Sequence, residues 1–224
     1  RGLAPAAGDE GQVGRTMNML AIDRSTDTQS VAVAKDGKVV GRVFAGLDAR
    51  SAEWPLKIRA FLADNGLAVN DLDRILVGQG PGSFAGIRAA LAFAQGLALG
   101  NSAKTTEVVG LPSTYALTRV GARTAVVGDA RRDRFWVVLY EGVACVKDFA
   151  LVSKDELANA VPEHYAVVTP DGARIEQLLQ GVFGHHYKGS LVPLAQRLVE
   201  VALADPSLPK PEPLPLYLQP AVRA

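Results

Sequence analysis

The chain is poor in the side chains that hold metals or form disulfides. Its 224 residues include one cysteine, Cys145, and three histidines, His164, His185 and His186. A single cysteine excludes a disulfide framework within the chain, and we expect Cys145, in the apolar run 143–146, to be a buried structural thiol. No histidine has the HxxxH or HExxH spacing, so the sequence predicts no metal site.

The sequence also lacks a strong charge of either sign and a long hydrophobic run. It has 24 basic and 23 acidic residues, for a formal net charge of +1, whereas a protein that binds nucleic acid alone usually has a basic face. No stretch reaches the roughly 18 apolar residues of a membrane helix. Residues 1–16 lack the apolar core of a signal peptide and read as a disordered leader or a cloning remnant. We therefore expect a cytoplasmic protein without membrane contact.

The order of predicted elements repeats in the two halves of the chain. A short apolar strand ends at Asp23 and is followed by a polar turn, a hairpin, a helix, a strand and a glycine-containing turn. The same order begins again at residue 124, with Asp129 in the place of Asp23. Such a repeat favours a duplicated α/β unit, and two facing lobes of this plan describe the actin-like fold of sugar kinases and acetate kinases.

The repeat also suggests where the chain divides. We expect an N-terminal lobe at 17–103, a smaller C-terminal lobe at 104–204 and a tail at 205–224. The tail is rich in proline, which excludes a helix and predicts an extended segment over the surface.

A glycine-rich turn between a strand and a helix is the sharpest local feature. In the run Gly80-Pro81-Gly82-Ser83, Ser83 is expected to cap a helix that ends at Leu99. Free N–H groups and the helix dipole favour an anion at such a place. The alternative is a tight turn in which glycines let the helix pack closely. The weak candidates for binding a cofactor are Gly80, Gly82, Ser83, Asp23 and Arg131.

The two strand-end aspartates, Asp23 and Asp129, could be general bases or magnesium ligands, or could simply cap turns. In actin-like kinases the turns after such aspartates are rich in glycine. Here the turns at 24–26 and 130–132 contain none, so side chains would crowd a phosphate, although arginines could contact it instead. We therefore predict no catalytic residue in this chain.

The helix at 83–99 is apolar on nearly all sides, so it must be buried on nearly all sides. One stripe of small residues would allow a second helix to approach closely. Either the chain itself or a partner covers this stripe, and we expect a partner. The predicted interface residues are Trp54, Ile58, Ala85, Arg88, Ala89, Ala92, Gln95 and Gly96.

Several segments resemble the TsaB (YeaZ) family, which takes part in tRNA threonylcarbamoyladenosine synthesis. The run GPGSFAGIR at 80–88 is the most specific of them and is shared mainly with the related TsaD family, whose histidine metal ligands this chain lacks. The other matching segments are LAID at 20–23, SVAV at 30–33, VGLPST at 109–114, DAR at 129–131 and LYL at 216–218.

The resemblance implies a subunit that is not catalytic by itself. The family supports TsaD, which transfers threonylcarbamoyl to adenosine in tRNA, and TsaE, a small ATPase, joins them in bacteria. The implied partners are a TsaD homologue, a TsaE homologue and a second copy of the chain, with tRNA contacted only indirectly. No cofactor is implied for the isolated chain, with ATP bound only in the assembled complex. The residues alone leave a stand-alone ATPase or phosphotransferase open, and nucleotide binding by the isolated chain distinguishes the two.

Overall fold

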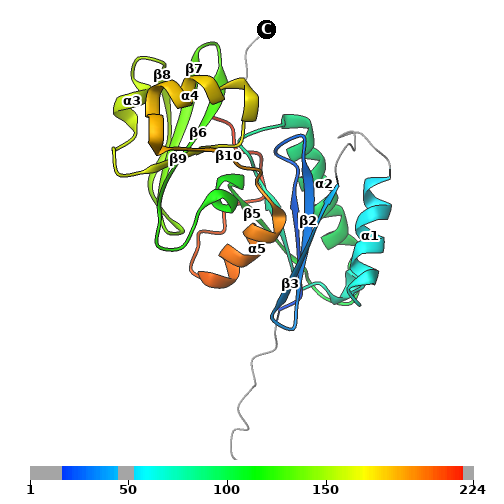
Figure 1. Ribbon diagram of the computed structural model, residues 1–224. Helices are drawn as coiled ribbons and strands as arrows, with labels where there is room; N and C mark the ends of the chain where they lie inside the picture. The colour runs from blue at the N-terminus through cyan, green and yellow to red at the C-terminus, as the bar shows by residue number, and fades with distance from the viewer. Residues whose placement is uncertain (1–16, 45–52, 219–224) are drawn as a thin grey trace, which may run out of the picture.

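The computed structural model describes residues 17–44 and 53–218, which form two lobes (Figure 1). The first lobe is built on a five-stranded sheet of order β3-β2-β1-β4-β5. β1 and β3 are antiparallel to β2, whereas β4 is parallel to β1 and β5 to β4. Its strands are β1 (Met19–Asp23), β2 (Gln29–Lys35), β3 (Lys38–Phe44), β4 (Arg74–Gly78) and β5 (Glu107–Leu111).

The second lobe repeats this sheet strand for strand. Its order is β10-β9-β6-β7-β8, with β6, β7 and β8 antiparallel and β9 and β10 parallel to β6. The predicted duplication of an α/β unit, and with it the two-lobed actin-like fold, is therefore confirmed. The strands are β6 (Arg123–Arg131), β7 (Arg134–Glu141), β8 (Ala144–Ser153), β9 (Ala166–Thr169) and β10 (Tyr187–Ser190).

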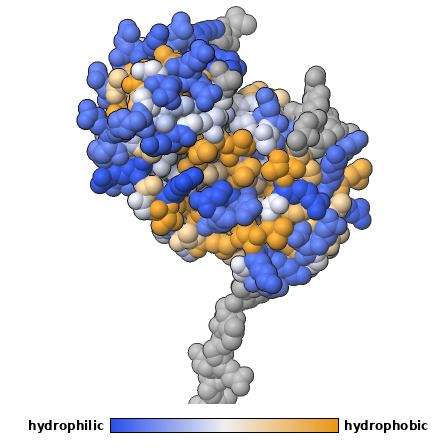
Figure 2. Space-filling view, viewed as in Figure 1, coloured by the Kyte–Doolittle hydropathy of each residue, from blue (hydrophilic) through white to orange (hydrophobic). Residues whose placement is uncertain are grey.

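Helices cover both faces of the first sheet (Figure 1). Successive strand residues point to opposite faces, so Leu20 and Ile22 of β1 pack with α1 (Trp54–Asp64) and α2 (Phe84–Gly100). Met19 and Ala21 pack on the other side, in a cluster that includes α5 (Ala195–Ala204) and residues of the second sheet. In the same view, apolar surface gathers near the junction of the lobes and over the first lobe, whereas the second lobe is mostly hydrophilic (Figure 2).

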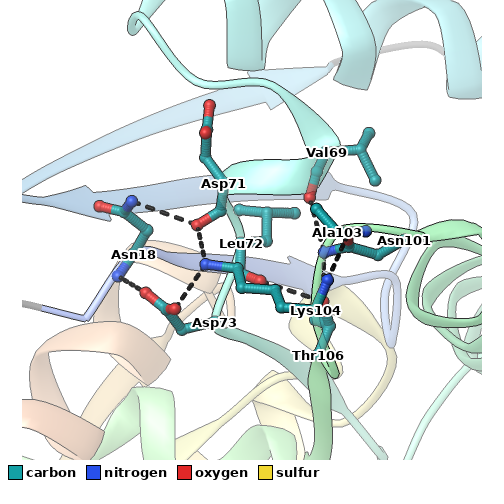
Figure 3. Close-up of polar contacts among 9 residues, drawn as sticks. All are labelled: Asn18, Val69, Asp71, Leu72, Asp73, Asn101, Ala103, Lys104 and Thr106. Carbon is teal, nitrogen blue, oxygen red and sulfur yellow. Dashed lines mark hydrogen bonds and ion pairs between the residues drawn. The ribbon is translucent and has the colours of Figure 1, made fainter.

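The expected division at residue 103 does not match the sheets. β5, at residues 107–111, pairs with β4 and completes the first sheet. The segment 101–106, which precedes β5, is held to the first lobe by a polar cluster (Figure 3). This cluster lies at the end of the sheet opposite to Asp23. There Lys104 Nζ lies 2.5 Å from Asp73 Oδ1, and Thr106 Oγ1 donates to the Leu72 carbonyl at 3.0 Å. The first lobe therefore continues to β5.

The C-terminal part of the chain also returns to the first lobe. α5 packs on β1, β2 and β3. Residues 195–204 therefore belong to the first lobe, whereas the sequence analysis assigned them to the second. Neither α5 nor β10 was predicted. Residues 205–218, the described part of the proline-rich tail, contain no helix or strand.

The predicted helices appear with some changes in their bounds. α2 begins after Ser83, whose side chain accepts a hydrogen bond from the Gly86 N–H, as expected of a cap. α1 begins at Trp54 and follows Glu53 in the described part of the chain. In the second lobe, α3 (Leu157–Ala160) and α4 (Glu176–Phe183) are short. Short 3₁₀ turns complete the fold at η1 (Val69–Asp71), η2 (Ser113–Leu117), η3 (Gly172–Arg174) and η4 (Gly184–His186).

The prediction that Cys145 is a buried thiol was wrong. Cys145 is exposed because it lies on β8, the edge strand of the second sheet, where residues 144–148 all face solvent. An apolar run of strand-forming residues does not reveal whether the strand is central or at an edge.

Candidate functional site

A cleft of about 780 Å³ lies between the lobes, where the segments after β1, β4 and β9 meet the end of β6. Parallel strands bring their carboxyl ends to the same edge of a sheet, which is where ligands bind in open α/β sheets. The residues that line the cleft include Ser25, Thr26, Pro81, Gly82, Ser83, Phe84, Asp129, Arg131, Asp171, Arg174, Leu216 and Tyr217.

Asp23 lies behind this cleft rather than in it. Its side chain is fully buried, and Oδ1 accepts hydrogen bonds from the Ser25 N–H at 2.9 Å and the Ser25 hydroxyl at 2.6 Å. The other oxygen, Oδ2, faces Ser113 but has no hydrogen bond of full geometry among the described residues. Burial raises the pKa of the Asp23 carboxyl, and the polar contacts with Ser113 and Ser25 offset part of this rise. Asp23 is thus a turn cap without access to a ligand in the cleft.

The glycine-rich turn is packed against the turn that follows β1. The Ser83 N–H donates to the Ser25 carbonyl at 2.6 Å, so it already has an acceptor. A methyl group added at Gly82 would lie 2.0 Å from the same carbonyl oxygen, and one at Gly86 would lie 2.2 Å from the Arg24 carbonyl. Here the glycines permit close approach of protein backbone, which favours the interpretation of a tight turn over that of an anion site.

Asp129 holds the equivalent position on the second lobe. Its Oδ1 accepts the Arg131 N–H at 2.7 Å, so it caps its turn in the same way as Asp23. Its Oδ2 lies 3.4 Å from Arg131 Nη1 and 3.8 Å from Arg174 Nη1, and Arg174 also pairs with Asp171. Each arginine at this wall of the cleft therefore faces a carboxylate of the same chain.

The β6–β7 turn has an unusual backbone. Arg131, Arg132 and Asp133 have φ values of 68°, 53° and 56°, in the left-handed region that glycine and asparagine favour. Arg131 pairs directly with Arg134, so Arg132 and Asp133 form a two-residue hairpin turn. All four side chains are exposed, and Arg131 is also among the residues that line the cleft.

The face of α2 that turns away from the sheet is exposed along its length. Ala85, Arg88, Ala92, Gln95 and Gly96 are exposed, and Ala89 is half-buried. Phe84 and Leu99 add apolar surface to the two ends of this face, with 50% and 89% exposure. We call these eight residues the α2 face. Within residues 17–44 and 53–218, the chain therefore leaves this face largely uncovered.

Two residues predicted to join this interface are instead in the core. Trp54 and Ile58 are 2% and 1% exposed, and the Trp54 ring packs edge-on against Phe93 at 5.1 Å. The Arg24 guanidinium lies 4.4 Å from the Trp54 ring and covers it further. These contacts bury a side chain that was expected to need a partner.

Of the weak candidates for binding a cofactor, Gly82, Ser83 and Arg131 line the cleft, whereas Gly80 and the buried Asp23 do not. Sequence reasoning thus named residues of both walls of the cleft. It missed Asp171 and Arg174, although the turn at 169–172 was recognised as equivalent to the glycine-rich turn. It also missed the part played by the tail, whose residues Leu216 and Tyr217 form a wall of the cleft. No local pattern indicates where an extended tail will lie.

In residues 17–44 and 53–218, no three histidine, cysteine or acidic side chains gather as they would around a metal ion. Over the same ranges, no helix combines the length and the apolar content needed to cross a membrane.

The duplicated sheets and the cleft between them define a protein of the two-lobed, actin-like α/β class. The fold is similar to that of YeaZ from Pseudomonas aeruginosa, with a TM-score of 0.72 and 23% identity over 89% of this chain and 100% of that one. Residues 51–200 match the family model described as TsaD, tRNA N6-adenosine threonylcarbamoyltransferase.

Two relatives are similar to this chain in sequence. The protein TsaB of Escherichia coli K12, named for tRNA threonylcarbamoyladenosine biosynthesis, is 36% identical over 84 residues, which are 38% of this chain and 36% of that protein. The uncharacterized protein Rv3421c of Mycobacterium tuberculosis is 33% identical over 165 residues, or 66% of this chain and 74% of that protein. The chain belongs to the TsaB (YeaZ) family, as its resemblance predicted.

Proposed function

We propose that this chain is a non-catalytic subunit that binds a TsaD homologue and supports threonylcarbamoyl transfer to adenosine in tRNA. A TsaE homologue would join the same complex, in the cytoplasm, and ATP would be bound only after assembly. Membership of the TsaB (YeaZ) family supports a role in tRNA threonylcarbamoyladenosine biosynthesis. The exposed α2 face is the observation that supports a binding role. The packed turns around Ser25 and Ser83 support the absence of catalysis by the chain alone.

The argument for docking starts from the two sides of α2. Gly86, Ile87, Ala90, Leu91 and Ala94 are buried against the first sheet. The opposite α2 face remains in water, although burying apolar surface is worth roughly 25 cal/mol per Å². Its small residues at 85, 89, 92 and 96 recur every three or four positions and so form one row along the helix. A second helix can therefore approach this row closely.

A second copy of the chain could use the same row. Self-pairing through one helix requires two-fold symmetry, which is the commonest symmetry of protein dimers. We propose that the homodimer and the complex with the TsaD homologue use the same face and exclude one another. Contact with tRNA would then be made through the partner, and no membrane is involved.

The first experiment asks whether the complex exists. The chain is co-purified with a TsaD homologue from the same genome, and tRNA modification is assayed with each subunit omitted in turn. We expect co-purification and a loss of modification when this chain is left out. Full modification without it would contradict the proposal.

The second experiment tests the face. Ala92→Glu places a charge in the centre of the row, and we expect it to weaken TsaD binding and self-association at least 10-fold, or about 1.4 kcal/mol. The matched control is Ala158→Glu on α3 of the other lobe, also at an exposed alanine, which should change neither. Both variants should keep the circular dichroism of the wild type. Unchanged TsaD affinity in Ala92→Glu would show that the α2 face is not the docking surface.

A further inference from the structure

Residues 212–218, which we call the C-terminal strap, run along the cleft and are held there by hydrogen bonds to one residue, Gln79. Gln79 Nε2 donates to the carbonyl oxygens of Glu212 and Leu214, both at 2.7 Å. The Leu216 N–H donates to the Gln79 carbonyl at 3.0 Å. Three hydrogen bonds to one residue therefore fix the path of a segment that has no helix or strand of its own.

The place of Gln79 is itself well defined. Gln79 is only 5% exposed, and its N–H donates to the Leu111 carbonyl at 2.8 Å, next to the β4–β5 pair. A methyl group added at Gly110 would lie 2.3 Å from Gln79 Nε2. Glycine at this position therefore leaves the space through which the amide reaches the strap, and the two residues act as a built attachment point.

The strap places an aromatic ring at the head of the α2 face. The Tyr217 ring lies 5.7 Å from the ring of Phe84, the first residue of α2. The Phe84 ring also contacts Arg88, whose guanidinium lies 5.1 Å from the centre of the ring. Tyr217 is 60% exposed and Phe84 is 50% exposed. The three side chains form a partly exposed cluster at the start of α2, where Phe84 and Tyr217 also line the cleft.

We propose that the C-terminal strap is part of the docking surface for the protein partner of α2, with Tyr217 as a contact residue and Gln79 as the residue that positions it. Tyrosine and arginine are the residue types that most often dominate the free energy of protein–protein binding. The α2 face carries no cation besides Arg88, so its chemistry suits an apolar helix of a protein. This inference rests on the proposed docking role of α2 and adds a second chain segment to it.

The decisive property of Gln79 is that it is buried, so it cannot touch a partner. Gln79→Leu removes both side-chain hydrogen bonds to the strap and leaves the α2 face unaltered. Tyr217→Ala removes the ring from the surface, and Tyr217→Phe is its matched control because the ring contact with Phe84 remains. The affinity of the full chain for the TsaD homologue is measured for each variant, together with amide hydrogen exchange of residues 212–218.

We expect Gln79→Leu to speed exchange in the strap and to weaken partner binding about 10-fold. Tyr217→Ala should weaken binding by a similar factor, whereas Tyr217→Phe should bind like the wild type. Wild-type affinity in Tyr217→Ala, or in Gln79→Leu with a released strap, would overturn this inference. If Ala92→Glu still loses binding in that case, the proposed function stands; if Ala92→Glu also binds normally, the docking surface itself is refuted.

Discussion

At the scale of single residues, the two strand-end aspartates limit what the cleft can do. Asp23 and Asp129 each accept the N–H of the residue two positions later, which is the usual behaviour of aspartate in a turn. Asp23 is also buried behind the turn that it caps. Neither residue is therefore presented as a free carboxylate toward a substrate. Replacing either one should leave tRNA modification by the assembled complex largely intact, provided that the variant folds.

The first prediction concerns the pH dependence that Asp23 adds to stability. Because its folded pKa lies above the ordinary value of 3.8, the folded state holds the proton more tightly than the unfolded state. The free energy of unfolding should therefore fall as pH rises from 3.8 through the folded pKa, and the loss is complete above it. Asp23→Asn keeps the acceptor for Ser25 and does not titrate. Its urea midpoint relative to that of the wild type should rise across this window. An equal offset at every pH would contradict the assignment.

The second prediction concerns the left-handed residues of the β6–β7 turn. A residue other than glycine costs roughly 1 kcal/mol in this region, and Asp133 has a φ of 56°. We expect Asp133→Gly to raise the free energy of unfolding by about 0.5–1 kcal/mol. Asp133→Ala is the matched control, because it removes the same carboxylate without relieving the backbone. If both variants gain equally, the charge and not the backbone is responsible.

At the scale of elements, α2 has one face packed against the first lobe and one face that is exposed. Its glycines differ accordingly. Gly86 faces the Arg24 carbonyl, where an added methyl group would lie at 2.2 Å, whereas a methyl group at Gly96 would meet nothing else within 4 Å in residues 17–44 and 53–218. Gly86→Ala must shift backbone and should destabilise the protein. Gly96→Ala should stabilise it by about 0.5–1 kcal/mol, the usual difference inside a helix. Urea unfolding of the two variants tests this, and stabilisation by Gly86→Ala would contradict the packing.

The sequence predicts elements that have local signals. It does not predict where a segment packs when its partner lies far away in the sequence. The capping serine and the small-residue row of α2 were readable, as were the hairpin turns and the repeated strand order. α5 has a regular apolar pattern, with Ala195, Leu198, Val199 and Val201 buried, but no local signal says that it returns to the first sheet. The strap was missed for the same reason, since its position depends on Gln79, more than 130 residues away in the sequence.

At the scale of the whole molecule, the two lobes share one core instead of meeting at an open hinge. One buried cluster contains Leu76 and Val109 of the first sheet, Val126 and Val138 of the second, and Leu198 of α5. The Thr114 and Tyr140 hydroxyls join the lobes by a hydrogen bond of 2.7 Å. Opening the lobes further would therefore expose buried apolar side chains.

The last prediction follows from this arrangement and concerns nucleotide. A nucleotide between the lobes needs backbone N–H groups for its phosphates, yet the Ser83 N–H is bonded to Ser25 and both cleft arginines face carboxylates. We therefore expect calorimetry of the isolated chain with magnesium and ATP to give a Kd no tighter than about 1 mM, or −4.1 kcal/mol. The assembled complex with the TsaD and TsaE homologues serves as the positive control. A micromolar Kd for the isolated chain, with ATP located between the lobes, would instead support a stand-alone ATPase or phosphotransferase.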